Sequence, residues 1–305
     1  MKHLLSIKDL STKELNEIFA LTAELKFKKS QFKEALSGKT LGLIFQKPSN
    51  RTRVSFQVGM FELGGHSIYL SPGEINLGVR ESVKDVAKTL SRYLQCVVLR
   101  VFSHNDILEF ARHSSIPVIN GLSDLTHPCQ GLADVFTIKE KIKSFKNKTL
   151  AYVGDGNNVC HSLIYACAKA GLNLSIAVPK GYEPSKFVMK DGFQLCKISK
   201  SKLLIVNDPK LAVKNADVIY TDVWASMGQE KEAVLRKKIF KDYQINKKLL
   251  SYTKSGCLVM HCLPAHRGQE ITDEVIDSKD SIVFDQAENR LHVQKAVLLK
   301  LLKGN

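Results

Sequence analysis

Short apolar runs alternate with longer stretches of helical spacing along the chain, and this alternation restricts the fold more than any other feature. Each run is too short for a typical helix and is bounded by glycine, proline or polar residues. Strands that alternate with helices form parallel sheets covered by helices. The sequence therefore predicts an α/β fold of doubly wound, mainly parallel sheets. The runs are LGLIF, HSIYL, CVVLRVF, IPVIN, TLAYV, LSIAVP, KLLIVND, ADVIYTDV and CLVMHCLP.

The length of 305 residues is more than one compact core usually contains, so two domains are expected. A polar Lys-Asn-Lys stretch at residues 146–148 separates two series of strands and helices. We therefore predict a first domain over residues 1–146 and a second over residues 147–290. An apolar helix at about residues 291–305 should pack back on the first domain.

The stretch FQKPSNRTRVSF, residues 45–56, contains the parts of an anion site. A strand ends, Pro48 breaks the pattern, and Ser49 or Asn50 can cap a new helix. Free backbone N–H groups and the positive end of the helix dipole at such a terminus attract phosphate, and the Ser49 and Thr52 hydroxyls and an arginine, Arg51 or Arg53, would add to that attraction. A capped surface helix with solvated arginines is the alternative interpretation.

Other polar side chains follow predicted strands, where open α/β sheets bind their ligands. Arg100 ends the strand CVVLR, and a loop containing His127 and Gln130 follows the strand IPVIN. The strand TLAYV leads into GDGNN, which lacks the third glycine of a dinucleotide fingerprint because Val159 stands there. These positions are candidates for ligand binding.

Composition excludes several classes of protein. With 44% hydrophobic and 25% charged residues the chain is an ordinary globular protein, and its formal charge of +15 comes from scattered lysines, which indicates a small anionic ligand only weakly. Seven cysteines without a CxxC pair argue against a zinc site and a disulfide framework and favour a reducing cytoplasm. We found no apolar run long enough to span a membrane and no signal peptide.

Five segments resemble, in the same order, the motifs of aspartate/ornithine carbamoyltransferases. They are SNRTRVSF, HPCQ, GDGNN, DVWASMG and HCLP. Asn50 stands where that family usually has threonine. The resemblance implies two α/β domains with the active site in the cleft between them, carbamoyl phosphate binding to the first domain, ornithine binding to the second, and neither a metal nor an organic cofactor.

Carried over residue by residue, the resemblance assigns most of a carbamoyl phosphate site. Attack of an amine on this substrate builds negative charge on the carbonyl oxygen and on the departing phosphate, so cations and hydrogen-bond donors are needed at both. The family pattern places Ser49, Asn50, Arg51 and Thr52 on the phosphate, Arg100, His127 and Thr52 near the carbonyl oxygen, and Gln130 and the backbone at Cys262 and Leu263 on the amino group, with Arg290 reaching the same site.

The resemblance also assigns an ornithine site. Asn158 and the Met227 backbone would bind the α-carboxylate, Asp222 and Ser226 the α-ammonium, and Cys262 would accept a proton from the δ-amine. A buried, inert thiol is the alternative for Cys262. The DVWASMG and HCLP segments resemble the ornithine branch, which implies transfer of the carbamoyl group to L-ornithine, giving L-citrulline and phosphate, in arginine biosynthesis.

The resemblance further implies a homotrimer, or a multiple of trimers, with shared sites. Asn76 stands where relatives commonly carry glutamine or histidine that reaches the phosphate bound by a neighbouring subunit, and asparagine is shorter.

Three rival interpretations of the function remain. A carbamoyltransferase for another amine shares most motifs, a nicotinamide-dependent dehydrogenase would use only GDGNN, and a nucleic-acid-binding protein would rest on charge alone. We therefore expect no nucleic-acid partner and no membrane partner.

Overall fold

The computed structural model describes residues 1–75, 77–225 and 230–303, and the chain divides into two compact units. Unit 1 consists of Met1–Ala133 and the chain from Glu288 onward, and unit 2 is Asp134–Ala287. Each unit contains one parallel sheet covered by helices, so the predicted fold class of two parallel-sheet α/β domains is confirmed.

The sheet of unit 1 has the strand order β2-β1-β3-β4. Helices α4 and α5 pack with the loop residue Leu77 against one face of β1, β3 and β4 in a single apolar cluster. Its strands are β1 Thr40–Phe45, β2 His66–Leu70, β3 Cys96–Arg100 and β4 Val118–Leu122. Its own helices are α1 Thr12–Phe27, α2 Asn50–Glu62, α3 Pro72–Ile75, α4 Val83–Leu90 and α5 His104–His113, with 3-10 turns at Ile7–Asp9 and Lys29–Phe32.

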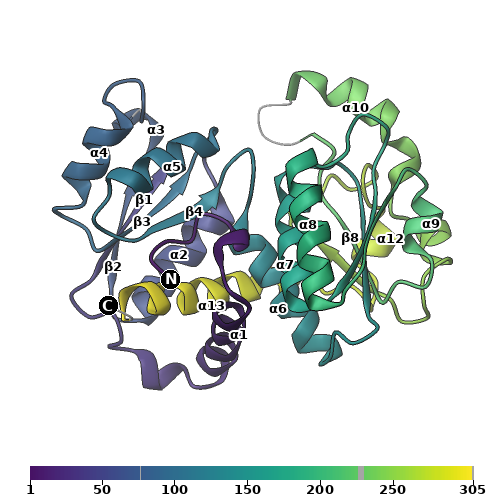
Figure 1. Cartoon of the computed structure of the whole chain (residues 1–305), viewed down its shortest axis with the longest axis horizontal. Helices are drawn as coiled ribbons and strands as arrows, with labels where there is room; N and C mark the ends of the chain where they lie inside the picture. The colour runs from purple at the N-terminus through teal and green to yellow at the C-terminus, as the bar shows by residue number, and fades with distance from the viewer. Residues whose placement is uncertain (76, 226–229, 304–305) are drawn as a thin grey trace. The chain divides into compact units, whose positions relative to one another are not determined.

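Two long helices contain the boundaries of the units: α6, Pro128–Ile142, and α13, Val283–Leu302. Within unit 1, α13 lies beside α1 (Figure 1), where Lys300 and Glu17 form an ion pair. On α2, a Cβ at Gly59 would meet the Lys295 side chain of α13 at 3.2 Å. The last part of the chain therefore belongs to the packing of unit 1.

The sheet of unit 2 has the order β7-β6-β5-β8-β9. Helices α7 and α8 pack closely together, since a Cβ at Gly192 of α8 would lie 2.4 Å from Ile164 of α7 (Figure 1). Another apolar cluster joins the sheet to α9, α11 and α12. The strands are β5 Thr149–Val153, β6 Asn173–Ala177, β7 Leu203–Val206, β8 Val218–Thr221 and β9 Leu258–His261. The helices are α7 Asn158–Ala170, α8 Lys186–Ser199, α9 Pro209–Val213, α10 Ala233–Ile239, α11 Lys247–Leu250 and α12 Asp273–Ile276, with 3-10 turns at Glu230–Glu232 and Lys241–Tyr243.

Each sheet has one topological switch point, which is a pair of neighbouring parallel strands from which the chain proceeds toward opposite edges of the sheet. In unit 1 it lies between β1 and β3, and in unit 2 between β5 and β8. Ligands of open α/β sheets bind outside the carboxyl ends of the strands at such points. The residues that follow β1, β3, β5 and β8 are therefore the first to consider for function.

Two helix boundaries differ from the sequence-based expectation. The HPCQ segment was expected in a loop, but α6 already begins at Pro128, because proline suits the first position of a helix, where no N–H partner is needed. The final helix begins at Val283, well before residue 291, so Arg290 projects from a continuous helix. No described helix has the length and apolar character needed to cross a membrane.

Candidate active site

The first group of candidate residues surrounds the carboxyl ends of β1 and β3. Phe45 at the end of β1 lies opposite Arg100 at the end of β3 in the strand register. Helix α2 then begins with Ser49 as its N-cap, whose hydroxyl accepts a hydrogen bond from the Thr52 N–H at 3.4 Å. The predicted helix start is confirmed, and it gives this strand end a helix N-terminus, a favourable position for an anion.

Three arginines influence the same histidine in unit 1. Burial, together with the charges of Arg290, Arg100 and Arg51, lowers the pKa of His127 well below its ordinary value. Burial and the charges of Arg290 and Arg51 also lower the pKa of Arg100, to about 10. At neutral pH this cluster combines three cations with a neutral imidazole. Because like charges held close together repel each other, an anionic ligand would be strongly favoured here.

Arg290 connects other candidate residues of unit 1 from its position on α13. Its guanidinium donates to Gln130 Oε1 at 2.5 Å and to Thr52 Oγ1 at 3.2 Å. Arg290, Gln130 and Thr52 are all at most 4% exposed. The rigid fork of the arginine therefore fixes the carboxamide of the HPCQ segment relative to the first turn of α2.

The two arginines of the stretch at residues 45–56, Arg51 and Arg53, differ in their surroundings. Arg53 is exposed, donates to Gln57 Oε1 at 3.2 Å, and its guanidinium stacks 3.8 Å from the ring centre of Tyr69. Arg51 instead acts electrostatically on Arg100 and His127. These surroundings favour Arg51 over Arg53 as the anion-binding arginine that the resemblance implies.

The second group lies at the carboxyl ends of three neighbouring strands of unit 2. Tyr152 of β5 lies opposite Tyr220 of β8, and Thr221 of β8 lies opposite His261 of β9. Because the strands are parallel, the GDGNN segment, Asp222 and Cys262 follow at the same edge of the sheet. The sequence pattern alone placed these segments after strands but gave no register.

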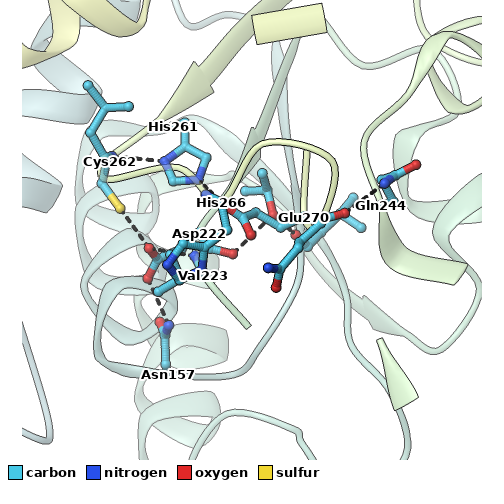
Figure 2. A network of polar contacts seen from close by, with 12 residues as sticks. Asn157, Asp222, Val223, Gln244, His261, Cys262, His266 and Glu270 are labelled. Carbon is cyan, nitrogen blue, oxygen red and sulfur yellow. Dashed lines mark hydrogen bonds and ion pairs between the residues drawn. The ribbon is translucent and has the colours of Figure 1, made fainter. Parts of the chain in front are cut away.

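Asp222 is the centre of a polar network in unit 2 (Figure 2). Its Oδ2 accepts from Asn157 Nδ2 at 2.9 Å, and its Oδ1 accepts from Cys262 Sγ at 2.9 Å and from the Val223 N–H at 2.8 Å. Asn157 also caps α7, since its Oδ1 accepts from the N–H groups of Val159 and Cys160. A single buried carboxylate thus connects the strand ends of β5, β8 and β9.

Cys262, the expected proton acceptor for the δ-amine, is a thiol next to a carboxylate. Burial and the neighbouring Asp222 carboxylate raise the pKa of the Cys262 thiol well above its ordinary value. The sulfur therefore carries its proton at neutral pH and donates it to Asp222.

His261 and Glu270 form a fully buried pair that supports the loop of Cys262 (Figure 2). The Leu263 N–H donates to His261 Nδ1 at 2.8 Å, so the other ring nitrogen carries the hydrogen and donates to Glu270 Oε1 at 3.0 Å. The same carboxylate oxygen accepts from the His266 N–H at 2.6 Å. This pair fixes the backbone at Cys262 and Leu263.

Several expected residues have other outcomes. Asn76, Ser226 and Met227 lie outside the described residues. Asn158 is half-buried at the first position of α7, and the contact with Asp222 is made by its neighbour Asn157, which the sequence reasoning missed. The preference of asparagine for the N-cap could have indicated Asn157. The part of the chain that the structure describes contains no cluster of histidine, cysteine and acidic side chains that could hold a metal ion.

The sequence matches known families over almost its whole length. Residues 2–140 match the family described as "Aspartate/ornithine carbamoyltransferase, carbamoyl-P binding domain", and residues 146–301 match "Aspartate/ornithine carbamoyltransferase, Asp/Orn binding domain". A curated relative from Archaeoglobus fulgidus named "Ornithine carbamoyltransferase" is 55% identical over 304 residues, covering 99% of this chain and 98% of the relative.

Solved structures show the same similarity. The ornithine carbamoyltransferase from Pyrococcus furiosus superposes with a TM-score of 0.96 at 50% identity, covering all of this chain and 97% of that one. The anabolic ornithine carbamoyltransferase from Campylobacter jejuni superposes with a TM-score of 0.94 at 39% identity, with both chains covered completely. The similarity therefore extends over both units.

Proposed function

The chain belongs to the aspartate/ornithine carbamoyltransferase family, and on this basis we propose that it transfers the carbamoyl group of carbamoyl phosphate to the δ-amine of L-ornithine. The products are L-citrulline and phosphate. The observation that carries the proposal furthest is the convergence of Arg51, Arg100 and Arg290 on a neutral His127, because an acyl phosphate is dianionic and develops further charge on its carbonyl oxygen.

Carbamoyl phosphate binds to unit 1 in this proposal. Its phosphate meets the Arg51 guanidinium and the backbone N–H groups of the first turn of α2, from Ser49 to Thr52. Arg100 and the neutral His127 donate to the carbonyl oxygen, where negative charge grows during attack. Gln130, whose carboxamide is fixed by Arg290, binds the amino group.

Ornithine binds to unit 2. Asp222 is the only assigned group of the described residues that can neutralise the α-ammonium, and Asn158 at the start of α7 donates to the α-carboxylate. Ser226 and Met227 keep the roles that the family resemblance implies. The carbonyl groups at Cys262 and Leu263 accept from the carbamoyl amino group, and Cys262, held by its hydrogen bond to Asp222, lies beside the δ-amine.

We also propose a homotrimer in the cytoplasm, working in the direction of arginine biosynthesis. On α2, Val54, Val58 and Phe61 recur at helical spacing and are 49%, 38% and 80% exposed, which suits a surface covered by another subunit. All seven cysteines are free, which suits a reducing compartment. The name of the Campylobacter jejuni protein supports the biosynthetic direction.

A panel of amines tests the substrate. We expect the highest kcat/KM with L-ornithine, and much lower values with putrescine, N-acetylornithine and aspartate, because each of these three lacks the combination of free α-ammonium and δ-amine. Colorimetric detection of ureido products measures all four reactions. A product with aspartate alone, or a preference for putrescine, would require a different carbamoyltransferase activity.

Restoring the usual family residue by Asn50→Thr should change carbamoyl phosphate affinity by less than about tenfold, or 1.4 kcal/mol. Asn50 is exposed and occupies the first position of α2, so its backbone N–H rather than its side chain faces the phosphate in our proposal. Isothermal calorimetry without ornithine measures the affinity. A larger loss would mean that the Asn50 carboxamide itself contacts the ligand.

A further inference from the structure

Arg236 is a buried arginine of unit 2 that has no role in the function proposed so far. It projects from the short helix α10 and is 6% exposed. Its guanidinium lies against two aromatic rings, with the centre of the Tyr182 ring at 4.9 Å and that of the Phe240 ring at 6.0 Å. An arginine so far from water normally has a specific set of partners.

Two of those partners lie on different loops, and the third, Glu232, is the N-cap residue of α10 itself. Arg236 Nη1 donates to Asp155 Oδ2 and to the Trp224 carbonyl oxygen, both at 2.9 Å, and Nε donates to Glu232 Oε2 at 2.9 Å. Asp155 follows β5 and Trp224 follows β8. The guanidinium therefore joins the loops at the switch point of the sheet of unit 2.

Asp155 and Trp224 each lie two residues from a residue in the polar network of Figure 2. Asp155 comes two residues before Asn157, and Trp224 comes two residues after Asp222. The same two loops are joined a second time by the hydrogen bond from Asn157 to Asp222. Arg236 and this hydrogen bond thus join the same two loops.

The Asp155 side of this connection has little freedom to move. A Cβ at Gly156 would lie within 2.5 Å of backbone atoms of Tyr182, Glu183 and Pro184, so this part of the loop is pressed against that segment. Burial raises the pKa of Asp155 to about 6, an effect that Arg236 opposes. A buried ion pair contributes little net stability, because the cost of desolvating the two charges offsets their attraction. The Arg236–Asp155 pair therefore needs an explanation other than stability.

We propose that Arg236 is a positioning residue for the amine substrate, holding the loops of Asn157 and Asp222 at the spacing that ornithine requires. It acts through Asp155 and the Trp224 carbonyl and does not touch either substrate. The inference rests on the proposed binding of ornithine to unit 2. The inference goes beyond the proposed function because it makes the affinity for ornithine depend on a residue that does not contact ornithine.

The test uses Arg236→Gln and Asp155→Asn in the full-length protein. Both should raise the KM for ornithine at least about tenfold while kcat falls less than about threefold, because alignment of the loops is lost and the reacting groups remain. Carbamoyl phosphate affinity, measured by calorimetry, should stay within about twofold of the wild type. Arg236→Lys keeps the charge but lacks the fork that reaches both partners, so its KM should be intermediate.

A double variant tests whether Arg236 and Asp155 act together, and a matched control variant tests whether the effect on the KM for ornithine is specific to this pair. Arg236→Gln combined with Asp155→Asn should raise KM no further than the stronger single change, because the two residues act as one unit. Lys254→Gln removes a cation from the buried Asp217 at the other end of β8 and should leave the KM for ornithine unchanged.

Two outcomes would overturn the inference. One is a wild-type KM for ornithine in both single variants. The other is an equal loss of kcat, ornithine KM and carbamoyl phosphate affinity together with a lower Tm, which would show a merely structural role. Failure of the proposed function is distinguishable, since in that case the wild-type protein would form no citrulline at all.

Discussion

Replacing Asp222 by asparagine should lower kcat/KM for ornithine by roughly 100- to 5,000-fold, corresponding to about 3–5 kcal/mol for breaking a buried charge pair. The carboxylate uses both oxygens as acceptors, for Asn157, Val223 and Cys262. An amide can accept at only one atom, and it cannot neutralise the α-ammonium of ornithine. Steady-state kinetics with saturating carbamoyl phosphate measures the loss.

Two comparisons separate substrate recognition from a general defect. Carbamoyl phosphate affinity of Asp222→Asn should stay within about threefold of the wild type, because its proposed contacts with the phosphate lie in unit 1. Putrescine should lose less than ornithine, since it has no α-carboxylate and depends less on the amino-acid contacts. Asp217→Asn, at the opposite end of β8, provides the matched control. Equal losses for both amines would show that Asp222 supports the loop or the chemistry in general.

Arg100→Met should weaken carbamoyl phosphate binding at least about 100-fold, because hydrogen bonds to a charged ligand contribute roughly 1.5–3 kcal/mol each and a guanidinium can make two. The free protein should lose no thermal stability. Burial, Arg290 and Arg51 lower the pKa of Arg100 to about 10, which means that the fold disfavours its cationic form. Calorimetry without ornithine and a thermal melt measure the two effects.

Arg53→Met is the matched control for this prediction, since Arg53 belongs to the same sequence stretch but stacks on Tyr69. Its carbamoyl phosphate affinity should stay within about threefold of the wild type. Wild-type affinity in Arg100→Met would remove this residue from the anion site. A large loss in Arg53→Met would contradict the assignment of the anion to Arg51.

The local sequence predicted those parts of the fold that depend on neighbouring residues. The strand β1 and the cap at Ser49 follow from an apolar run, a proline and a capping residue within ten positions of one another. The strands of unit 2 were equally clear from their apolar runs. Strand order was not predictable in this way, because it depends on which of several parallel neighbours pack best.

The missed residues share one property: only the folded chain brings them to their partners. Asn157 reaches Asp222 across 65 positions, and Arg236 reaches Asp155 across 81. Glu270 is nine positions from His261, and only the fold of the intervening loop brings them together. The spacing of apolar residues along the sequence does not indicate such side-chain pairs. The raised pKa of the Cys262 thiol could not be predicted from the sequence for a related reason, since it depends on burial and on the carboxylate that the fold places beside it.

The most direct measurement follows the new bond. The protein is incubated with [¹³C]carbamoyl phosphate and L-ornithine labelled with ¹⁵N only at the δ-nitrogen, and the product is examined by NMR. We predict a ureido carbon split by one-bond ¹³C–¹⁵N coupling, together with one equivalent of phosphate. A carbamoyl carbon without that coupling, or phosphate release without any ¹³C-labelled citrulline, would contradict transfer to the δ-amine of ornithine.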